Sequence, residues 1–279
     1  MKILVAEKIA ADAIQYLKDE GFEVDERLGC SQDEIKGFIG DYDALIVRSV
    51  TQVNKDLLAN AKNLKVVGRA GNGIDNIDVA ACTEKGIIAV NTPEANIMAA
   101  GELAVAHAFS IFRNLCHANE AAHNDDFRRA QMIGNELEGK TAGIIGLGRI
   151  GQATAKILNA LNMKVIAYDA FQSESGKQVA EYVDLDTLLA QSDVIFLHCP
   201  LFPETEGIIN KDNIAKMKDG VILINNSRGQ LVVEQDLADA LNSGKVYAAG
   251  LDVVSTEPIK ADNPLKTAKN TITTTPVRL

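Results

Sequence analysis

The chain has 279 residues, of which 47% are apolar and 24% charged, so two domains of ordinary size with substantial cores are possible. Its net charge of −10 argues against a nucleic-acid partner, which needs a basic face, and gives no reason to expect an anionic membrane surface. No apolar run approaches the ~18 residues of a membrane span, and no signal peptide is indicated. The four cysteines form no CxxC pair, so neither a zinc site nor a disulfide framework is indicated. The composition predicts a cytoplasmic protein with reduced thiols and no metal.

The first third of the chain alternates short apolar runs with amphipathic segments. The apolar runs predict strands at residues 3–6, 43–47, 64–68 and 87–90. The amphipathic segments predict helices at residues 10–19, 31–39, 55–61 and 79–84. Because strands that alternate with helices form parallel sheets with crossover helices, residues 1–96 are predicted to form one α/β domain.

A second α/β system follows a long helical pattern at residues 96–123, which predicts a helix that links two domains. The apolar stretch 103–115 of this helix is expected to supply an interface between subunits. Further strands are predicted at residues 141–145, 164–168, 193–198, 221–225 and 248–253. Further helices are predicted at residues 152–162, 211–217 and 234–243. Residues 97–279 therefore form the second predicted domain, which includes the linking helix.

The second domain begins with the sequence GLGRIG, which stands between a predicted strand and a predicted helix. Gly146 allows a tight turn, Gly148 lets a pyrophosphate approach the backbone, and Gly151 lets the helix pack on the strand. The diphosphate of a dinucleotide would lie at the helix N-terminus, where free N–H groups favour negative charge. Asp169 follows the next strand, 18 residues after Gly151, close to the ~20 expected of a dinucleotide site. A carboxylate there accepts hydrogen bonds from ribose hydroxyls and repels a 2′-phosphate, so NAD is favoured over NADP.

Eight sequence elements together resemble the D-isomer-specific 2-hydroxyacid dehydrogenases, and among them the short D-3-phosphoglycerate dehydrogenases. They are Arg48-Ser49-Val50-Thr51, GRAGNGIDNID (residues 68–78), Asn91-Thr92-Pro93, GLGRIG (residues 146–151), His198-Cys199-Pro200-Leu201, Asn225-Asn226-Ser227-Arg228-Gly229, Leu251-Asp252-Val253 and Glu257-Pro258. The resemblance implies two doubly wound parallel-sheet domains, a flavodoxin-like substrate domain and a Rossmann NAD-binding domain. It implies hydride transfer between NAD(H) and a D-2-hydroxy acid or 2-oxo acid, here the 3-phosphoglycerate and 3-phosphohydroxypyruvate of serine biosynthesis. It also implies a homodimer.

In this family an arginine holds the substrate carboxylate and polarises the 2-oxo group, and a histidine oriented by a glutamate transfers the proton. The resemblance assigns these catalytic roles to Arg228 and, for the glutamate, to Glu257. Arg228 follows the strand at 221–225, at the edge of a doubly wound sheet where ligands bind, and a guanidinium can grip a carboxylate at two points. The alternative is a surface arginine paired with a nearby acid, which the flanking Asn226, Ser227 and Gly229 disfavour.

The cofactor NAD is expected to contact the fingerprint and the loops that follow the later strands. The assigned residues are Gly146, Gly148, Arg149, Ile150, Gly151, Asp169, Cys199, Pro200, Thr205, Asn226, Ser227 and Asp252. Asp252 resembles the residue that fixes the nicotinamide amide, although an acid at a strand end could equally cap a turn. His198 is interpreted as a wall of the pocket and Cys199 as a small apolar residue on the adenine side. His107, His117 and His123 are expected at the surface or at an interface.

Substrate binding is assigned, by the same resemblance, to seven residues of the first domain: Arg48, Ser49, Ala70, Gly71, Asn72, Gly73 and Asn96. The loop at residues 69–73 would present backbone N–H groups to the substrate carboxylate. Arg48 and Ser49 resemble the phosphate contacts of phosphoglycerate dehydrogenases. For Arg48, an ordinary solvated charge after a strand is an equally open interpretation.

The end of the sequence departs from the family pattern. The acid/base histidine of the family follows a Thr-Pro pair, whereas here Thr275-Pro276 is followed by Val277, and the family's last helix is also absent. Valine cannot transfer a proton, and loss of a general acid/base lowers the rate by ~10²–10⁴. We therefore expect impaired activity, with Glu257 either solvated and idle or donating a proton through water. A frameshift or early stop, an artificial shortening and a natural non-catalytic relative are three accounts of this ending.

Two other functions remain open on the sequence alone. The chain could be a catalytically inactive NAD-binding interaction or regulatory module, like the dehydrogenase-like transcriptional corepressors, as Val277 suggests. It could also be a different Rossmann enzyme, such as a relative of alanine dehydrogenase, which the Asn-Ser-Arg-Gly and Glu-Pro elements disfavour.

Overall fold

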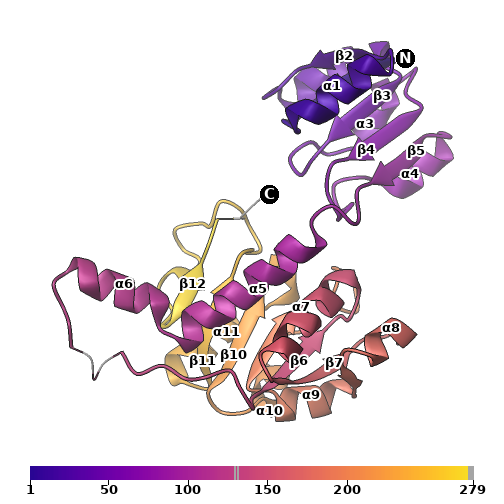
Figure 1. Cartoon of the computed structure of the whole chain (residues 1–279). Helices are drawn as coiled ribbons and strands as arrows, with labels where there is room; N and C mark the ends of the chain where they lie inside the picture. The colour runs from indigo at the N-terminus through magenta and orange to yellow at the C-terminus, as the bar shows by residue number, and fades with distance from the viewer. Residues whose placement is uncertain (129, 131, 276–279) are drawn as a thin grey trace. The chain divides into compact units, whose positions relative to one another are not determined.

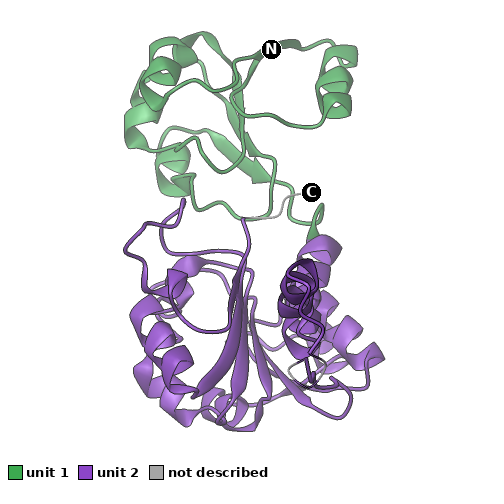
Figure 2. Cartoon of the chain, turned by 90° about the vertical axis from the view of Figure 1, so that its left-hand side faces the viewer, with its two compact units in different colours: residues 1–96 green, residues 97–279 purple. Residues whose placement is uncertain are grey.

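The computed structural model describes residues 1–128, 130 and 132–275. The chain divides into two compact units, one of residues 1–96 and one of residues 97–279 (Figure 2). Each unit has its own sheet, its own helices and its own apolar core.

Unit 1 is built on a five-stranded parallel sheet whose order is β2-β1-β3-β4-β5 (Figure 1). The strands are β1 (Lys2–Val5), β2 (Glu23–Glu26), β3 (Ala44–Val47), β4 (Val66–Arg69) and β5 (Ile88–Asn91). This is the flavodoxin-like order, as the resemblance implied. The sequence analysis missed β2, because this edge strand pairs only with β1 and its Glu-Val-Asp-Glu sequence shows no apolar run.

The helices of unit 1 lie close to their predicted positions. They are α1 (Ala11–Asp19), α2 (Gln32–Phe38), η1 (Ile39–Asp41), α3 (Lys55–Asn60) and α4 (Val79–Glu84). Their buried residues, among them Ile14, Ile35 and Leu57, pack on the apolar strands. Asn54 and Asp78 cap the first turns of α3 and α4 by accepting hydrogen bonds from backbone N–H groups.

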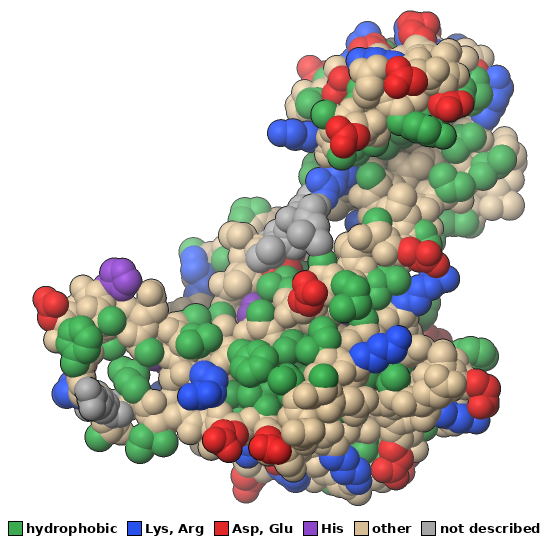
Figure 3. Space-filling view, in the orientation of Figure 1, with side chains coloured by type: hydrophobic (Ala, Val, Ile, Leu, Met, Phe, Trp, Pro, Cys, Tyr) green, Lys and Arg blue, Asp and Glu red, His purple; other side chains and the backbone are tan. Residues whose placement is uncertain are grey.

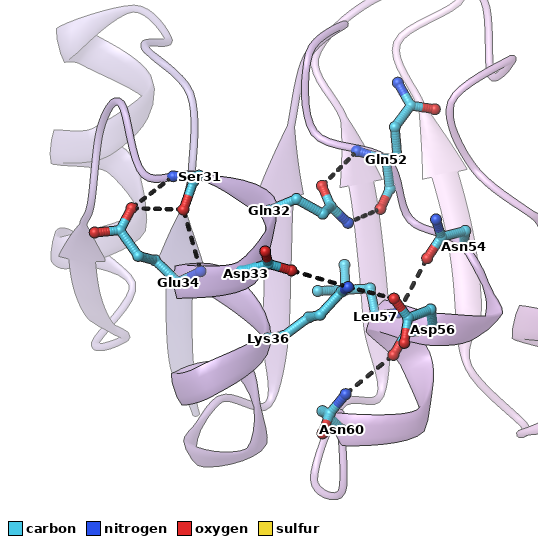
Figure 4. Close-up of polar contacts among 10 residues, drawn as sticks. All are labelled: Ser31, Gln32, Asp33, Glu34, Lys36, Gln52, Asn54, Asp56, Leu57 and Asn60. Atoms are coloured by element: carbon cyan, nitrogen blue, oxygen red, sulfur yellow. Dashed lines mark hydrogen bonds and ion pairs between the residues drawn. The ribbon is translucent and has the colours of Figure 1, made fainter.

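The start of α2 carries a full capping box (Figure 4). The Ser31 side chain accepts a hydrogen bond from the Glu34 N–H, and the Glu34 carboxylate accepts one in return from the Ser31 N–H at 2.7 Å. On the same side, Lys36 forms ion pairs with Asp33 and with Asp56 of α3 (Figure 4). Local sequence alone therefore fixes the first turn of α2, and charge pairing ties α2 to α3.

Unit 2 is built on a seven-stranded parallel sheet (Figure 1). The order runs outward from β6 through β9, β10, β11 and β12 on one side and through β7 and β8 on the other. The strands are β6 (Thr141–Ile145), β7 (Lys164–Tyr168), β8 (Glu181–Tyr182), β9 (Val194–Leu197), β10 (Val221–Asn225), β11 (Val246–Leu251) and β12 (Thr271–Thr273). The reversal between β6 and β9 is the switch point at which doubly wound sheets bind ligands, and the predicted Rossmann topology is confirmed.

Helices α5 and α7 cover one face of this sheet, and α9, α10 and α11 cover the other. The helices of unit 2 are α5 (Ile97–Phe112), α6 (Leu115–His123), α7 (Arg149–Ala160), α8 (Glu174–Lys177), α9 (Leu185–Gln191), α10 (Lys211–Lys216) and α11 (Glu234–Ser243), with short 3-10 turns η3 (Gly229–Leu231) and η4 (Pro264–Lys266). Helix α6 buries none of its residues and extends away from the sheet (Figure 1). The single helix predicted at 96–123 is wrong, because Asn114 adopts a left-handed φ of 53° and separates α5 from α6. Asparagine tolerates this conformation better than most residues, which is why the apolar pattern alone did not reveal the break.

The core of unit 2 has two layers, one on each face of the sheet. Along β9, Val194 and Phe196 join the layer with α5 and α7, whereas Ile195 and Leu197 join the layer with α9, α10 and α11. This alternation is what a strand buried on both faces requires. The apolar side of α5, including Val105 and Ile111, faces this core, so the expectation that stretch 103–115 supplies an interface is not supported for these residues.

Among the described residues, no helix is both long and apolar enough to span a membrane. Within the same residues, no group of three or more His, Cys, Asp or Glu side chains is arranged to hold a metal ion. Acidic and basic side chains are interspersed over the face of each unit seen in Figure 3.

Candidate active site

The fingerprint turn of unit 2 joins β6 to α7 and has no room for side chains at two of its glycines. Gly146 has a φ of +95°, and a Cβ there would lie 2.4 Å from the Cys199 backbone nitrogen. A Cβ on Gly151 would lie 2.2 Å from the Gly146 carbonyl oxygen. Glycine at 146 and 151 is therefore required by the fold itself, whether or not a ligand is bound.

Gly148 differs from its two neighbours in the fingerprint. It is the N-cap residue of α7, provides no side-chain cap, is exposed, and a Cβ there would meet nothing within 4 Å. The fold thus tolerates a side chain at this position but leaves open space beside the first turn of a twelve-residue helix. Backbone N–H groups in that turn carry the positive end of the helix dipole, so the space suits an anion. Arg149, exposed, and Ile150, half-buried, occupy the same turn.

Asp169 follows β7 and orders the fingerprint turn. One carboxylate oxygen accepts a hydrogen bond from the Leu147 N–H at 2.7 Å, and the other accepts one from the Phe171 N–H at 2.8 Å. Each oxygen keeps a second lone pair for another donor. The acid predicted to accept the ribose hydroxyls is therefore fixed in place by the turn next to it.

The end of β9 contributes His198 and Cys199. His198 Nε2 lies 2.9 Å from the Thr154 Oγ1 of α7, and its ring stacks on Phe196 with centroids 6.4 Å apart. Burial lowers the pKa of His198 to about 4, so at neutral pH the ring is uncharged and unsuited to acid/base work. Burial also raises the pKa of Cys199 to about 11, which keeps its thiol protonated.

The loop after β9 holds Pro200 and Thr205. The Thr205 hydroxyl donates to the Pro200 carbonyl oxygen at 2.7 Å and accepts from the Phe202 N–H at 2.8 Å. Thr205 therefore holds this loop in place, because its hydroxyl is hydrogen-bonded to backbone groups within the loop whether or not it also contacts a cofactor.

Arg228 follows β10 in a turn shaped by Asn225. The Asn225 side chain donates to the Arg228 carbonyl oxygen at 2.8 Å and accepts from the Ser227 N–H at 3.0 Å. The Arg228 guanidinium donates to the Ser227 carbonyl oxygen at 2.7 Å. A Cβ on Gly229 would lie 2.0 Å from the Val254 carbonyl carbon, so glycine lets the loop after β10 pack directly on the loop after β11. Arg228 and Asp252 thus stand on adjoining loops.

Four polar side chains form a connected network beneath the ends of β10, β11 and β12. Asp252 is buried and accepts a hydrogen bond from the Thr274 hydroxyl at 2.6 Å. Thr274 Oγ1 lies 3.4 Å from His107 Nε2, and His107 Nδ1 lies 3.2 Å from Asn226 Oδ1. The expectation that His107 lies at the surface is wrong, because this side of α5 faces the sheet and leaves the residue 3% exposed. His117 and His123 are exposed, as expected.

A cavity of about 750 Å³ opens beside this network. It is lined by Asp252, Glu257 and Thr274, together with apolar side chains such as Ile259 and Leu265. Glu257 is exposed to solvent. The loop that carries it is anchored by Glu234, whose carboxylate accepts hydrogen bonds from the Ser255 N–H at 2.7 Å and from the Asn263 side chain at 2.9 Å.

In unit 1, Arg48 and Ser49 follow β3 in a loop that wraps one carboxylate. Glu7 accepts hydrogen bonds from four consecutive backbone N–H groups, of residues 48 to 51, at 2.9 to 3.2 Å. Burial acts to raise the pKa of Glu7, but these four N–H groups outweigh it and hold the pKa below its ordinary value. Asn76 closes the loop from the other side by donating to the carbonyl oxygens of Arg48 and Thr51.

The loop at residues 70–73 follows β4, the neighbour of β3, so it lies at the same edge of the sheet as Arg48. The N–H groups of Ala70 and Gly71 already donate to the carbonyl oxygens of Val47 and Arg69. The expectation that all of this loop offers N–H groups to a carboxylate therefore needs correction, and Asn72 and Gly73 remain the candidates. Asn91 holds the loop by donating to the Asn72 carbonyl oxygen at 2.5 Å. Asn96 is exposed and ends unit 1.

The sequence matches the D-isomer specific 2-hydroxyacid dehydrogenase, NAD binding domain family over residues 105–276. The chain belongs to this family. The match begins within α5 and includes the fingerprint, Asp169 and the three strand ends that carry Arg228, Asp252 and Thr274. Unit 2 therefore contains the NAD-binding domain of this family.

Relatives extend the similarity to unit 1. The chain is 46% identical over 276 residues to the D-3-phosphoglycerate dehydrogenase of Archaeoglobus fulgidus, covering 98% of this chain and 52% of that one. It is 52% identical over 249 residues to the hydroxypyruvate reductase of Blautia hydrogenotrophica, covering 87% of this chain and 77% of that one. It therefore spans about half the length of the phosphoglycerate dehydrogenase. The NAD-dependent formate dehydrogenase of Staphylococcus aureus, solved in complex with NAD, superposes with a TM-score of 0.86 at 28% identity over 99% of this chain and 88% of that one.

The residues present fit the NAD that this family binds. Gly148 leaves an open cradle at a helix N-terminus, Asp169 has lone pairs for ribose hydroxyls, and the amide nitrogen of Asn226 is buried without a hydrogen-bond partner within the described part of the chain. An orphaned polar atom of this kind is unusual and points to a missing partner.

Three residues that shape these loops were not found from the sequence: Glu7, Glu234 and Thr274. Glu7 directly follows a strand end that the alternation did predict, so an acid at the edge where ligands bind was a usable signal. Thr274 follows the three-residue β12, which was not predicted, and carried no such signal. Val277, predicted to replace the acid/base histidine, lies outside the described residues.

Proposed function

We propose that this chain transfers hydride between NAD(H) and a D-2-hydroxy acid or its 2-oxo acid. The observation that carries the proposal is the pair formed by Gly148 and Asp169. An open helix N-cap lies beside a carboxylate that the same turn holds in place. The adjoining strand ends of unit 2 carry an arginine and a buried acid, the groups that a carboxylate substrate and a nicotinamide amide require.

The roles within unit 2 follow from the chemistry of each group. Asp169 binds the ribose hydroxyls and excludes a 2′-phosphate, and the first turn of α7 binds the diphosphate. Bound NADH supplies the hydride. Arg228 binds the substrate carboxylate and polarises the 2-oxo group, because a guanidinium offers two parallel donors to a carboxylate. Asp252 accepts hydrogen bonds from the carboxamide and so sets the face of the ring.

For the substrate we propose 3-phosphohydroxypyruvate or the corresponding 3-phosphoglycerate. Support comes from Arg48, a cation on a loop that Glu7 and Asn76 hold rigid, at the sheet edge it shares with the N–H groups of Asn72 and Gly73. Guanidinium groups suit phosphate recognition as well as carboxylate recognition. The relative from Archaeoglobus is named for this activity.

Hydroxypyruvate, without the phosphate, is the second candidate substrate. The relative from Blautia, which is 52% identical over its matched residues, is named a hydroxypyruvate reductase. NADH oxidation measured with 3-phosphohydroxypyruvate, hydroxypyruvate, glyoxylate and pyruvate separates the two candidates. A kcat/KM for the phosphorylated acid at least about tenfold above that for hydroxypyruvate supports the first, since one ionic contact is worth ~1.4 kcal/mol or more. Loss of this preference in an Arg48→Gln variant would place the phosphate at Arg48.

We propose that turnover is slow, because the residue after Thr275-Pro276 is Val277 and not histidine. A Val277→His variant is expected to raise kcat by ~10²–10⁴ if proton transfer limits the rate. Its control is Val277→Gln, which is polar and of similar volume to histidine but cannot transfer a proton. An equal rate for all three chains would remove proton transfer at this position from the proposal.

An inactive NAD-binding interaction module is a second function that Val277 favours. It predicts NADH binding without turnover, and a protein partner whose capture changes when NADH is added. A partner that binds equally with and without NADH would argue against this function.

We also propose a cytoplasmic homodimer. Free cysteines at positions 30, 82, 116 and 199 fit a reducing compartment. Because the apolar side of α5 is used within unit 2, the exposed side of α6, with Leu115, is the candidate interface. Light scattering of the wild type and of Leu115→Lys tests the dimer, and a mass unchanged by the substitution would exclude Leu115 from it.

A further inference from the structure

One side chain, His107, connects three neighbouring strand ends. It does so through a polar network whose other members are Asn226, Thr274 and Asp252. His107 comes from α5, whereas its partners follow β10 and β12, and Asp252 follows β11. The His107 ring packs closely against the sheet, since a Cβ on Gly250 would lie 3.2 Å from the ring carbon Cγ of His107. Glycine at position 250 therefore creates the space in which this ring can reach two strand ends at once.

Counting protons along the network fixes the direction of each hydrogen bond. Thr274 has one hydroxyl proton and gives it to the Asp252 carboxylate, which can only accept. Thr274 Oγ1 must therefore accept from His107 Nε2–H. Burial lowers the pKa of His107, so the ring carries one proton only, and Nδ1 is an acceptor.

An acceptor at His107 Nδ1 requires a donor from Asn226. The amide oxygen of Asn226 faces Nδ1 at 3.2 Å, while its amide nitrogen is buried without a hydrogen-bond partner among residues 1–128, 130 and 132–275. A half-turn of the amide exchanges the two atoms, and such orientations are assigned from their hydrogen-bond partners. The nitrogen then donates to Nδ1, and the oxygen becomes the buried atom that awaits a donor.

We propose that His107 is a positioning residue, whose Nε2-protonated ring holds Asp252 through Thr274 and leaves the Asn226 amide oxygen as an acceptor without a donor, so that the Asp252 and Asn226 oxygens receive the carboxamide of nicotinamide. This inference rests on the proposed function, because it assigns the two acceptors to the nicotinamide end of NAD. A primary amide offers two N–H donors, and the network presents two oxygen acceptors. His107 itself does not touch the ligand and acts only through its neighbours.

Thr274→Val and Thr274→Ser test the proposal in the full chain. Valine has the shape of threonine but no hydroxyl, whereas serine keeps the hydroxyl. Binding of NADH and of ADP-ribose, which lacks the nicotinamide, is measured by calorimetry for each variant. Thr274→Val is expected to weaken NADH binding roughly tenfold, the loss of one hydrogen bond of ~1.4 kcal/mol, and to leave ADP-ribose binding within about twofold. Thr274→Ser is expected to bind both ligands as the wild type does.

Two outcomes would overturn the proposal while the proposed function stands: equal weakening of NADH and ADP-ribose by Thr274→Val, or no weakening of either. A wild type that binds neither ligand overturns both the proposed function and this inference. The ring itself gives an independent readout in the unliganded wild type. ¹⁵N spectra of histidine-labelled protein are expected to show His107 as the Nε2–H tautomer at neutral pH, and the Nδ1–H tautomer would contradict the proton count.

Discussion

The carboxylate of Asp169 and the backbone N–H of Leu147 are joined by a 2.7 Å hydrogen bond, although 22 residues separate them in the sequence. The same carboxylate accepts a bond from the Phe171 N–H at 2.8 Å. The acid assigned to the ribose therefore also holds the fingerprint turn next to the loop after β7. On the proposed roles, a single side chain would link the geometry of the diphosphate site to the choice between NAD and NADP.

Asp169→Asn tests this double role. The amide keeps one acceptor but loses the charge that repels a 2′-phosphate, so NADPH is expected to bind at least about tenfold more tightly than it binds the wild type. NADH is expected to bind roughly tenfold more weakly, because the amide NH₂ now faces a backbone N–H. Fluorescence titration with each dinucleotide gives the ratio of the dissociation constants for NADH and NADPH. Asp239→Asn, on α11, is the matched control, and an unchanged NADH-to-NADPH ratio in Asp169→Asn would argue against the assignment.

Gly148→Ala and Gly151→Ala separate the glycine that serves a ligand from one that serves the fold. A Cβ at Gly151 would lie 2.2 Å from the Gly146 carbonyl oxygen, so this variant is expected to lose about 1–3 kcal/mol of unfolding free energy. A Cβ at Gly148 meets nothing within 4 Å, so its urea midpoint should stay that of the wild type. Its affinity for NADH should nevertheless fall, because the methyl group enters the space left for the diphosphate. Equal NADH affinity of Gly148→Ala and the wild type would show that the diphosphate does not occupy the open space beside Gly148.

Glu7→Gln tests the loop that carries Arg48. The amide NH₂ of glutamine would face backbone N–H groups that now donate to a carboxylate, and the loss is expected to be about 1.5–3 kcal/mol in unfolding free energy at pH 7. The pKa of Glu7 lies below its ordinary value of 4.5, so its contribution is fully present above pH 4.5 and is lost as the pH falls through the lowered pKa. The difference between wild type and variant in urea unfolding should therefore shrink at low pH. Glu84→Gln, an exposed acid on α4, should differ little from the wild type at any pH.

His198 gives the unfolding free energy a pH dependence of its own. Burial lowers its pKa from 6.5 to about 4, so between these values the unfolded chain binds a proton that the folded chain does not. Its contribution is fully present above pH 6.5 and declines as the pH falls toward 4. His198→Gln keeps a polar partner for Thr154 but does not titrate, so it should lose less stability than the wild type between pH 7.5 and pH 5. Urea unfolding at the two pH values measures this difference, and His123→Gln, at an exposed position, is the control. Equal losses of unfolding free energy in the wild type and in His198→Gln would contradict the lowered pKa.

Much of the fold could be predicted because most strands and helices have a recognisable pattern of apolar residues within their own sequence. Strands β6, β7 and β10 and helix α11 were placed at the residues where they occur, since buried strands read as apolar runs and amphipathic helices repeat along the chain. The strands that were missed are the short or polar edge strands β2, β8 and β12, which are stabilised by pairing with a neighbouring strand and show no apolar run of their own. The short helices α8 and α9 were also not predicted. The break at Asn114 was missed for a related reason, because a single backbone angle leaves the apolar pattern intact.

The sequence by itself determined the fingerprint, the acid after β7 and the arginine after β10, because these residues lie next to the strands that position them and their spacing is local. Only the tertiary structure decided that His107 lies beneath three strand ends and that Glu7 holds the loop 41 residues away. His107 and Thr274 are 167 residues apart, and no periodicity shows which side chain of a helix will meet which strand end. That meeting depends on how closely α5 approaches the sheet, and the approach is set by a missing Cβ at Gly250. Local chemistry thus predicted the residues of the dinucleotide site, whereas long-range packing decided which side chains hydrogen-bond to them.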